Sequence, residues 1–186
     1  MKKYLVWLIS LLILVSCGST QLSFEYFIEK YDRETLTLNL SDQGLQEMPD
    51  FEKYMTGSWL QDIYTIDLSD NDIQRIPEGT FDIFPNLKAI DLSSNDFKFG
   101  SDVSIPKTIK TLSLSNNILD AIAWFNAYTE LSRVDLTDNN LEDNNLSEFG
   151  WFKKLVELRV EGNNISEELL ESINKINNAP ARKVIQ

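Results

Sequence analysis

The sequence predicts an α/β fold, a solenoid of six stacked coils whose short strands lie side by side in one parallel, concave sheet. Three observations predict this fold. An eleven-residue frame recurs six times between residues 35 and 165. Apolar and polar positions alternate within the frame, as they do in a strand with one buried face. A side-chain amide stands at frame position nine in every copy. Helical or irregular segments would return each coil along the convex side.

The clearest copy of the frame spans residues 63–73. It has apolar residues at positions one, four, six and eleven and an asparagine at position nine, which are Ile63, Ile66, Leu68, Ile73 and Asn71. The six copies begin at Thr35, Ile63, Leu87, Ile109, Leu131 and Leu155, at spacings of 28, 24, 22, 22 and 24 residues. This pattern resembles the leucine-rich repeat family, whose repeats are about 20 to 29 residues long. The resemblance covers residues 35–165 and implies a scaffold that recognises ligands through its concave face.

The physics of a single coil explains why the copies must stack. A coil of this length cannot bury its apolar face alone, so neighbouring coils pair their strands and share one core. The asparagine amide at position nine offers donors and an acceptor to turn backbone groups that burial would leave unpaired. Gln43 replaces this asparagine in the first copy. The long first spacing indicates an inserted loop around residues 51–62.

The candidate binding face consists of frame positions three, five and seven, which parallel strands place in side-by-side rows about 4.8 Å apart. Row three is Thr37, Thr65, Ala89, Thr111, Arg133 and Glu157. Row five is Asn39, Asp67, Asp91, Ser113, Asp135 and Arg159, and row seven is Ser41, Ser69, Ser93, Ser115, Thr137 and Glu161. Small hydroxyl and acidic residues therefore give way to long charged ones at the carboxyl end. The candidate ligand-binding residues are Asp67, Asp91, Arg133, Asp135, Glu157, Arg159 and Glu161.

Each of these candidates also has a plainer interpretation. Asp-Leu-Ser is the family's common filler at positions five to seven, so Asp67, Asp91 and Asp135 can be ordinary scaffold residues. The charged residues at the carboxyl end can simply pair with one another on a solvated surface. Asp67 and Asp91 would lie on adjacent strands about 5 Å apart, a separation compatible with a retaining glycosidase or, with neighbouring serines, a divalent cation. The flat rows show no sign of a catalytic pocket, and we expect neither an enzyme nor a cofactor.

The amino terminus has the features of a bacterial export signal. Lys2 and Lys3 precede an apolar stretch over residues 4–15 that is too short to span a bilayer comfortably. Residues 14–17, Leu-Val-Ser-Cys, resemble a bacterial lipobox. The resemblance implies cleavage after residue 16 and lipidation of Cys17, with acyl chains such as palmitate anchoring the mature chain. The alternative is an ordinary cleaved signal followed by a free cysteine.

The chain therefore divides into five parts. Residues 1–16 form the lipoprotein signal peptide, 17–23 the lipidated cysteine and tether, 24–34 an amino-terminal cap, 35–165 the repeats, and 166–186 a carboxyl-terminal cap helix and loose tail. Gly18 follows the cysteine where an aspartate would resemble an inner-membrane retention signal. This favours an outer-membrane or cell-surface position within the bacterial envelope.

The two caps and the return segments have their own apolar patterns. Phe24, Phe27, Ile28 and Tyr31 share one helical face, which predicts a cap over the open end of the stack or, alternatively, a partner-binding helix. Ser166 can cap a terminal helix that carries Leu169, Leu170, Ile173 and Ile176. Between strands, we expect inward anchors at Trp59, Phe81, Phe84, Ile122, Trp124, Phe125, Leu146, Phe149, Trp151 and Phe152.

Composition excludes several function classes. The chain has one cysteine and no histidine, which leaves no internal disulfide and none of the histidine-dependent nucleophilic or zinc chemistry. The net charge is −12 and would become −14 on loss of Lys2 and Lys3, so nucleic acid is a poor partner.

We therefore expect a membrane-anchored monomer that recognises a protein or glycan. A structural scaffold of an envelope complex is the alternative function, and an enzyme with an aspartate pair is the remote one.

Overall fold

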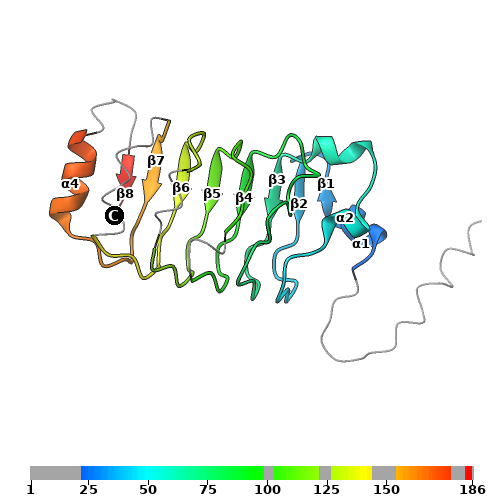
Figure 1. Ribbon diagram of the computed structural model, residues 1–186, viewed down its shortest axis with the longest axis horizontal. Coiled ribbons are helices and arrows are strands. Elements are labelled where there is room, and N and C mark those ends of the chain that lie inside the picture. Colours follow the sequence, from blue (N-terminus) through cyan, green and yellow to red (C-terminus); the bar gives the residue numbers. More distant parts are fainter. Residues whose placement is uncertain (1–21, 99–102, 122–126, 144–153, 177–182, 186) are drawn as a thin grey trace, which may run out of the picture.

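The computed structural model describes residues 22–98, 103–121, 127–143, 154–176 and 183–185. Within these ranges, eight strands follow one another in a single sheet, in the order of the chain (Figure 1). They are Tyr31–Asp32 (β1), Thr37–Asn39 (β2), Thr65–Asp67 (β3), Ala89–Asp91 (β4), Thr111–Ser113 (β5), Arg133–Asp135 (β6), Glu157–Arg159 (β7) and Lys183–Ile185 (β8). Strands β2 to β8 are parallel, and β1 is antiparallel to β2. The chain is a parallel β-solenoid with little helix, which confirms the predicted fold class.

Strands β2 to β7 occupy frame positions three to five of the six predicted copies. Residues at the same frame position pair across neighbouring strands, for example Thr37 with Thr65 and Asp67 with Asp91. The same register continues to β7. The three predicted rows of residues therefore exist as rows in the folded protein, and the six-coil frame is correct.

The core is a column of aliphatic side chains from frame positions four and six. None of these twelve residues is more than 3% exposed, and they are Leu38, Leu40, Ile66, Leu68, Ile90, Leu92, Leu112, Leu114, Val134, Leu136, Leu158 and Val160. Burying one such side chain contributes about 1.5–3 kcal/mol. Since neighbouring coils bury the same positions, the core runs the length of the stack and holds the coils in register.

A second column, made of asparagine side chains, links each coil to the one before it. The amide nitrogen of Asn117 donates to the carbonyls of Leu114 and Ser115 in its own turn, at 3.1 Å each. It also donates to the carbonyl of Leu92 in the preceding coil at 3.0 Å, and its oxygen accepts from the backbone N–H of Phe97 at 3.0 Å. The same pattern recurs at Asn71, Asn95, Asn139 and Asn163.

Gln43 takes the place of this asparagine at the amino-terminal end of the column. Its longer amide donates to the carbonyls of Ser41 and Asp42 at 2.7 and 2.9 Å. Its side-chain oxygen accepts a hydrogen bond of 3.2 Å from the hydroxyl of Tyr26. The substitution that departs from the repeat pattern therefore joins the first coil to the amino-terminal cap.

Frame position eight is left-handed in all six coils, a feature that we did not predict from the sequence. The backbone φ is between 52° and 71° at these positions, which are Asp42, Asp70, Ser94, Asn116, Asp138 and Gly162. Left-handed residues are most often Gly, Asn or Asp because their side chains resist this conformation least. All but Ser94 follow that preference, so the composition of this position was a usable signal.

We predict that Gly162→Ala destabilises the protein more than Gly44→Ala. Both glycines have positive φ, at 71° and 63°, so both substitutions add the cost of a left-handed alanine, about 1 to 2 kcal/mol. A Cβ at Gly44 meets no atom within 4 Å, whereas one at Gly162 would lie 1.9 Å from Oδ1 of Asp138 and 3.2 Å from its Cα. The second variant should lose about 1 to 3 kcal/mol more in urea unfolding. Equal losses would contradict this packing.

The amino-terminal cap contains helix α1, Phe24–Lys30, which begins where Ser23 accepts a hydrogen bond from the backbone N–H of Tyr26. Phe27 is fully buried, as predicted. Tyr31 is partly buried against the core, which agrees with the prediction. The prediction is wrong for Phe24 and Ile28, which are 38% and 43% exposed. The helix has only seven residues and inserts one side chain into the coil, while Tyr26 beside it binds Gln43.

The inserted segment of the first coil is helical, and our prediction of a loop there was wrong. It contains α2, Phe51–Tyr54, and a 3-10 helix, Ser58–Asp62. Asp50 starts α2 by accepting from the backbone N–H of Lys53 at 3.1 Å. Phe51 is buried against the ring of Phe27 in the cap, at 5.7 Å, and of Phe84 in the next coil, at 5.2 Å. The insertion therefore completes the core at this end.

The carboxyl-terminal cap contains helix α4, Glu167–Ile176. Ser166 caps it, as predicted, because its hydroxyl accepts from the backbone N–H of Leu169 at 3.2 Å. Leu170 is buried and Leu169 is partly buried against the core, as predicted. The side chains of the other two predicted contacts, Ile173 and Ile176, lie outside the described part. The predicted loose tail is wrong for residues 183–185, because β8 pairs in parallel with β7.

Two of the predicted anchors on the return segments are confirmed. Phe81 and Phe84 are 2% and 3% exposed and join the core. Trp59 is partly buried against the core within the 3-10 helix. The remaining anchors are outside the described residues, namely Ile122, Trp124, Phe125, Leu146, Phe149, Trp151 and Phe152. None of the described helices combines the length and apolar character that crossing a bilayer requires.

Candidate functional site

The candidate site is the strand face, defined here as the side chains at frame positions three, five and seven of the six coils. These residues are partly or fully exposed, whereas positions four and six between them are buried. The register aligns Asp67 with Asp91, Arg133 with Glu157 and Asp135 with Arg159. All seven predicted site residues therefore belong to one continuous face. Asp67 and Asp91 form one group, which we name the aspartate ladder. The other five residues form a charged patch near the carboxyl end.

Each aspartate at position five forms a local turn with the residue two positions later. Oδ1 of Asp67 accepts from the backbone N–H of Ser69 at 3.0 Å and from its hydroxyl at 2.7 Å. Asp91 binds Ser93 in the same way, and Asp135 binds Thr137. These bonds direct the chain out of the strand, so each aspartate has a structural role whether or not it also contacts a ligand.

The geometry around the ladder gives little support to a catalytic or cation-binding role. Ser69 and Ser93 already donate their hydroxyl protons to the aspartates. The described residues contain no group of three or more Asp, Glu, Cys or His side chains arranged to hold a metal. Four hollows of about 360 to 490 Å³ that described residues line include neither Asp67 nor Asp91. The ladder therefore lies outside these four hollows.

The charged patch consists of Arg133, Asp135, Glu157, Arg159 and Glu161. Arg159 is its centre, with Nε 2.8 Å from Oε1 of Glu157 and Nη1 3.8 Å from Oδ2 of Asp135. Nε of Arg133 lies 3.9 Å from the other oxygen of Glu157. Glu161 accepts from the hydroxyl of Thr137 at 3.2 Å. Mutual pairing, which was the plainer interpretation of these residues, is therefore the arrangement in the isolated chain.

The pairing leaves the two arginines available to solvent. The side chain of Arg133 is 61% exposed and that of Arg159 is 49% exposed, while Glu157 is 27% exposed. The hydrogen bond and charge of Glu157, with Asp135 adding a smaller effect, raise the pKa of Arg159, which stays charged at any physiological pH. Exposed ion pairs contribute only about 0–1 kcal/mol, so an incoming carboxylate can replace these partners at small cost.

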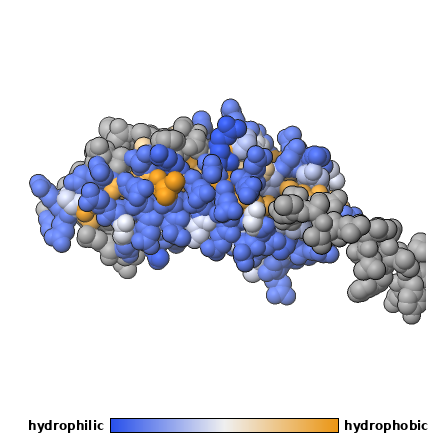
Figure 2. Space-filling model, turned by 90° about the horizontal axis from the view of Figure 1, so that it is seen from below, coloured by the Kyte–Doolittle hydropathy of each residue, from blue (hydrophilic) through white to orange (hydrophobic). Residues whose placement is uncertain are grey.

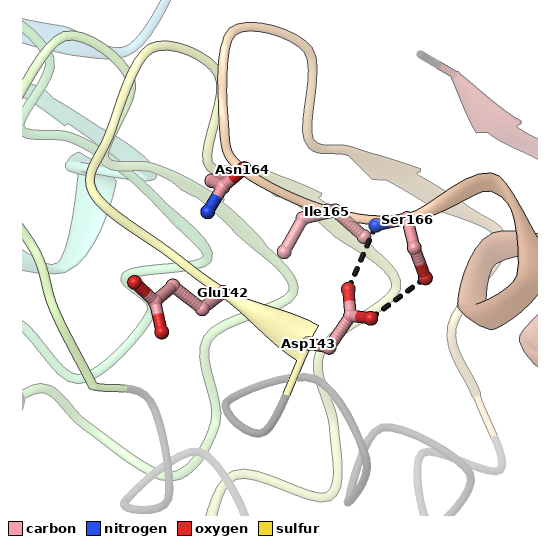
Figure 3. Close-up of a pocket in the computed structure, with 5 residues that line it drawn as sticks. All are labelled: Glu142, Asp143, Asn164, Ile165 and Ser166. Atoms are coloured by element: carbon pink, nitrogen blue, oxygen red, sulfur yellow. Dashed lines mark hydrogen bonds between the residues drawn. The ribbon is translucent and has the colours of Figure 1, made fainter.

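One hollow lies beside the start of α4 and is lined by Glu142, Asp143, Asn164, Ile165 and Ser166 (Figure 3). The carboxylate of Asp143 accepts two hydrogen bonds of 2.7 Å from Ser166, one from the backbone N–H and one from the hydroxyl. Ser166 in turn caps α4. This hollow is thus a junction that ties the cap helix to the coil, and sequence analysis did not identify Asp143.

We predict that acid loosens the start of α4. The Ser166 backbone N–H, followed by its hydroxyl, lowers the pKa of Asp143 below its ordinary value. A carboxyl whose pKa is lowered by folding stabilises the fold at pH values above its unfolded pKa, near 3.9, and the contribution disappears as pH falls through the folded pKa. Amide exchange in the first turn of α4 should therefore accelerate between about pH 4 and pH 2, relative to the intrinsic rate.

The variant Asp143→Asn is the control for this prediction. It should show faster exchange in α4 already at neutral pH and a smaller further change on acidification. Acid-induced exchange that is identical in the variant and the wild type would assign the effect to another carboxyl group.

The face seen in Figure 2 is mostly hydrophilic, with small and separate hydrophobic areas over the described residues. This agrees with an excess of acidic over basic residues, 29 against 17, in the whole chain. The large hydrophobic residues that are clearly exposed in the described part are Phe24, Ile28, Tyr64, Ile118 and Val156. None of them belongs to the strand face, so contacts made there would be polar and charged.

The repeated frame, the asparagine column and the parallel register define the class of protein: the chain has the leucine-rich repeat fold, as the sequence resemblance implied. Leucine-rich repeat proteins are usually binding modules without enzymatic activity, and proteins are their typical ligands. No protein-family model matches the sequence.

Solved structures identify what the chain is similar to. The leucine-rich repeat domain of APL1B matches with a TM-score of 0.57 and 21% identity, over 80% of this chain and 45% of that one. A leucine-rich repeat protein of Leptospira interrogans matches with a TM-score of 0.52 and 26% identity, over 69% of this chain and 32% of that one. The LRIM1/APL1C complex matches with a TM-score of 0.56 and 25% identity, over 70% and 24%. The chain thus spans less than half the length of each.

Proposed function

We propose that this protein is a lipid-anchored recognition module of a bacterial envelope, which binds a protein through the strand face. The observation that carries the proposal is the charged patch around Arg159. Four of its five residues are long charged side chains, where the earlier coils have small hydroxyl and acidic residues. Its ion pairs are exposed and cost little to exchange. A partner with a carboxylate-rich surface fits the arginines, and one with basic side chains fits Glu157 and Glu161.

The fold supports protein binding as the general activity. Leucine-rich repeat domains are typically protein-binding modules, and one similar structure is a complex of two leucine-rich repeat proteins. The rows of the strand face give a rigid platform because every strand is fixed by the core and by the asparagine column. A backbone that is already rigid loses little further conformational entropy on binding. A glycan ligand suits the same hydroxyl and acid rows and is an alternative within this proposal.

Anchorage and location rest on the amino-terminal sequence. Cys17 follows a basic and apolar export signal, and Gly18 favours an outer-membrane or cell-surface position. Lipidation at Cys17 would hold the solenoid within a short distance of the membrane, since residues 18–23 reach about 20 Å at most. We expect the protein to act as a monomer that presents its strand face to a partner.

The test of this proposal is a charge-reversed variant, Arg133→Glu with Arg159→Glu. Reversing both arginines should abolish capture of the partner in pull-downs from intact envelopes, since the patch would repel any carboxylate that it previously bound. The control is Lys53→Glu with Lys154→Glu, which changes the net charge equally but lies outside the strand face. Both variants should retain the wild-type melting temperature to within a few degrees, because all four residues are on the surface.

The outcomes of this comparison are distinct. Loss of the partner in the patch variant alone supports binding through the strand face. Loss in the control alone, or retention in both, would place the interface on the return segments or caps and favour the role of an envelope scaffold.

A further inference from the structure

The outer side of helix α1 carries an apolar surface that the fold does not cover. Phe24 and Ile28 are 38% and 43% exposed. They are four residues apart in a helix, so their side chains lie next to each other on one side. Phe27 of the same helix is fully buried, which fixes the orientation of α1 and keeps the exposed pair facing outward.

Aromatic side chains extend this surface beyond the helix. The ring of Phe24 makes an edge contact with Trp59 at 6.4 Å, and Tyr31 lies 5.3 Å from the same indole. We name Phe24, Ile28, Tyr31 and Trp59 the cap patch. The indole N–H of Trp59 donates to the carbonyl of Thr56, and the hydroxyl of Tyr31 donates to that of Asp62. Amphipathic aromatic rings of this kind favour the boundary between water and lipid.

The cap patch differs from the other exposed hydrophobic residues. Tyr64, Ile118 and Val156 lie in three separate coils and have no ring contacts among the interactions that the structure describes. By contrast, the cap patch joins two clearly exposed hydrophobic residues, Phe24 and Ile28, to the rings of Tyr31 and Trp59. It lies at the amino-terminal end of the solenoid, and the charged patch lies toward the opposite end (Figure 1).

The sequence places this surface next to the proposed anchor. Only six residues, 18–23, separate Cys17 from Phe24, and six extended residues span about 20 Å. An anchored Cys17 therefore keeps α1 within reach of the lipid headgroups. The segment 24–34 contains four acidic and two basic residues, so it gains nothing from anionic lipids and suits a zwitterionic surface.

We propose that the cap patch docks at the headgroup region of a zwitterionic bilayer and sets the orientation of the solenoid on the membrane. The acyl chains at Cys17 hold the protein at the membrane, and the cap patch adds a second contact that fixes its orientation. The end of the solenoid that carries α1 then lies at the membrane, and the charged patch lies toward the end that is farther from it. This inference rests on the membrane anchorage proposed above, and it explains how the strand face remains accessible to a partner.

The test tethers the mature chain, residues 17–186, through its only cysteine. Coupling Cys17 to a maleimide-bearing phospholipid attaches the protein to vesicles whether or not the cell lipidates it, so the two proposals are tested separately. The vesicles consist of phosphatidylcholine with brominated acyl chains, which quench tryptophan emission at close range. We expect quenching in the wild type and loss of most of it in Trp59→Phe, which identifies the quenched indole.

Charged variants show whether the cap patch itself causes the contact. Phe24→Glu with Ile28→Glu should reduce quenching of the tethered protein to the level of unbrominated vesicles. Ile118→Glu with Val156→Glu is matched in charge and exposure and should leave quenching unchanged. If circular dichroism shows that the glutamate variant is unfolded, Phe24→Ser with Ile28→Ser replaces it in the quenching experiment. Quenching that persists in Trp59→Phe, or that the control lowers equally, would overturn the proposal.

Discussion

Replacing Asn117 with alanine should destabilise the protein by several kcal/mol and uncouple the coils on either side. The substitution removes three hydrogen bonds to carbonyl oxygens and one from the N–H of Phe97. Asn117 is only 7% exposed, so water cannot readily replace these bonds. Each buried backbone group left without a partner costs about 1–3 kcal/mol. Urea unfolding monitored by circular dichroism would measure the loss.

Asn140→Ala is the matched control for this prediction, because Asn140 is an exposed asparagine in the same stack. Its substitution should change the free energy of unfolding by about 0.5 kcal/mol or less. A midpoint for Asn117→Ala equal to that of the control would mean that the turn satisfies its backbone groups in another way. Asn117→Asp adds a second comparison, since it keeps the acceptor and removes the donors.

Replacing Cys17 with serine should release the protein from membranes completely. A serine hydroxyl cannot carry the thioether-linked lipid, so the variant lacks the proposed anchor. Detergent phase partitioning should move the variant from the detergent phase to the aqueous phase. The folded domain should keep its melting temperature, because the cysteine precedes both the cap helix and the repeats in the sequence.

A conservative change nearby provides the control for the anchor. Ser19→Ala leaves the cysteine intact and should partition with the wild type. Partitioning of Cys17→Ser into detergent would contradict lipid anchorage. It would also leave the cap patch as the remaining candidate for membrane contact, which the tethered experiment examines separately.

The sequence predicted the repeating part of the fold because each repeat obeys the same physical requirement. Apolar residues at frame positions four and six must meet their counterparts in the next coil, so their spacing gave the strands and the register directly. The asparagine column followed from the same logic, since buried turns must satisfy their backbone groups. Both the strand register and the asparagine column depend on contacts between equivalent positions of neighbouring repeats, and the sequence displays these positions several times.

The parts that were missed occur once in the chain and lack this redundancy. Residues 51–62 fold into α2 and a 3-10 helix because Phe51 has aromatic partners from the cap and from the next coil, contacts that no local pattern displays. Ile28 is exposed because α1 is too short for a full buried face. The strand β8 depends on the free edge of β7, which only the folded stack provides.

The candidate site was predicted in position but not in its contacts. The rows on the strand face follow from strand register alone, so all seven residues lie where the frame places them. The turns of the aspartates and the pairs around Arg159 depend on side-chain geometry, which the frame does not specify. The structure is therefore needed to identify the hydrogen bonds and ion pairs that a partner would displace.

The most direct test of recognition through the strand face is site-specific photocrosslinking in living cells. A photoreactive amino acid replaces Thr111, which pairs with Arg133 on the strand face, or, as the control, Arg75, an exposed arginine outside it. Our account predicts a discrete crosslinked product from position 111 that is absent from position 75 and disappears when Arg133 and Arg159 are both changed to glutamate. A product from position 75 with none from position 111 would contradict the account.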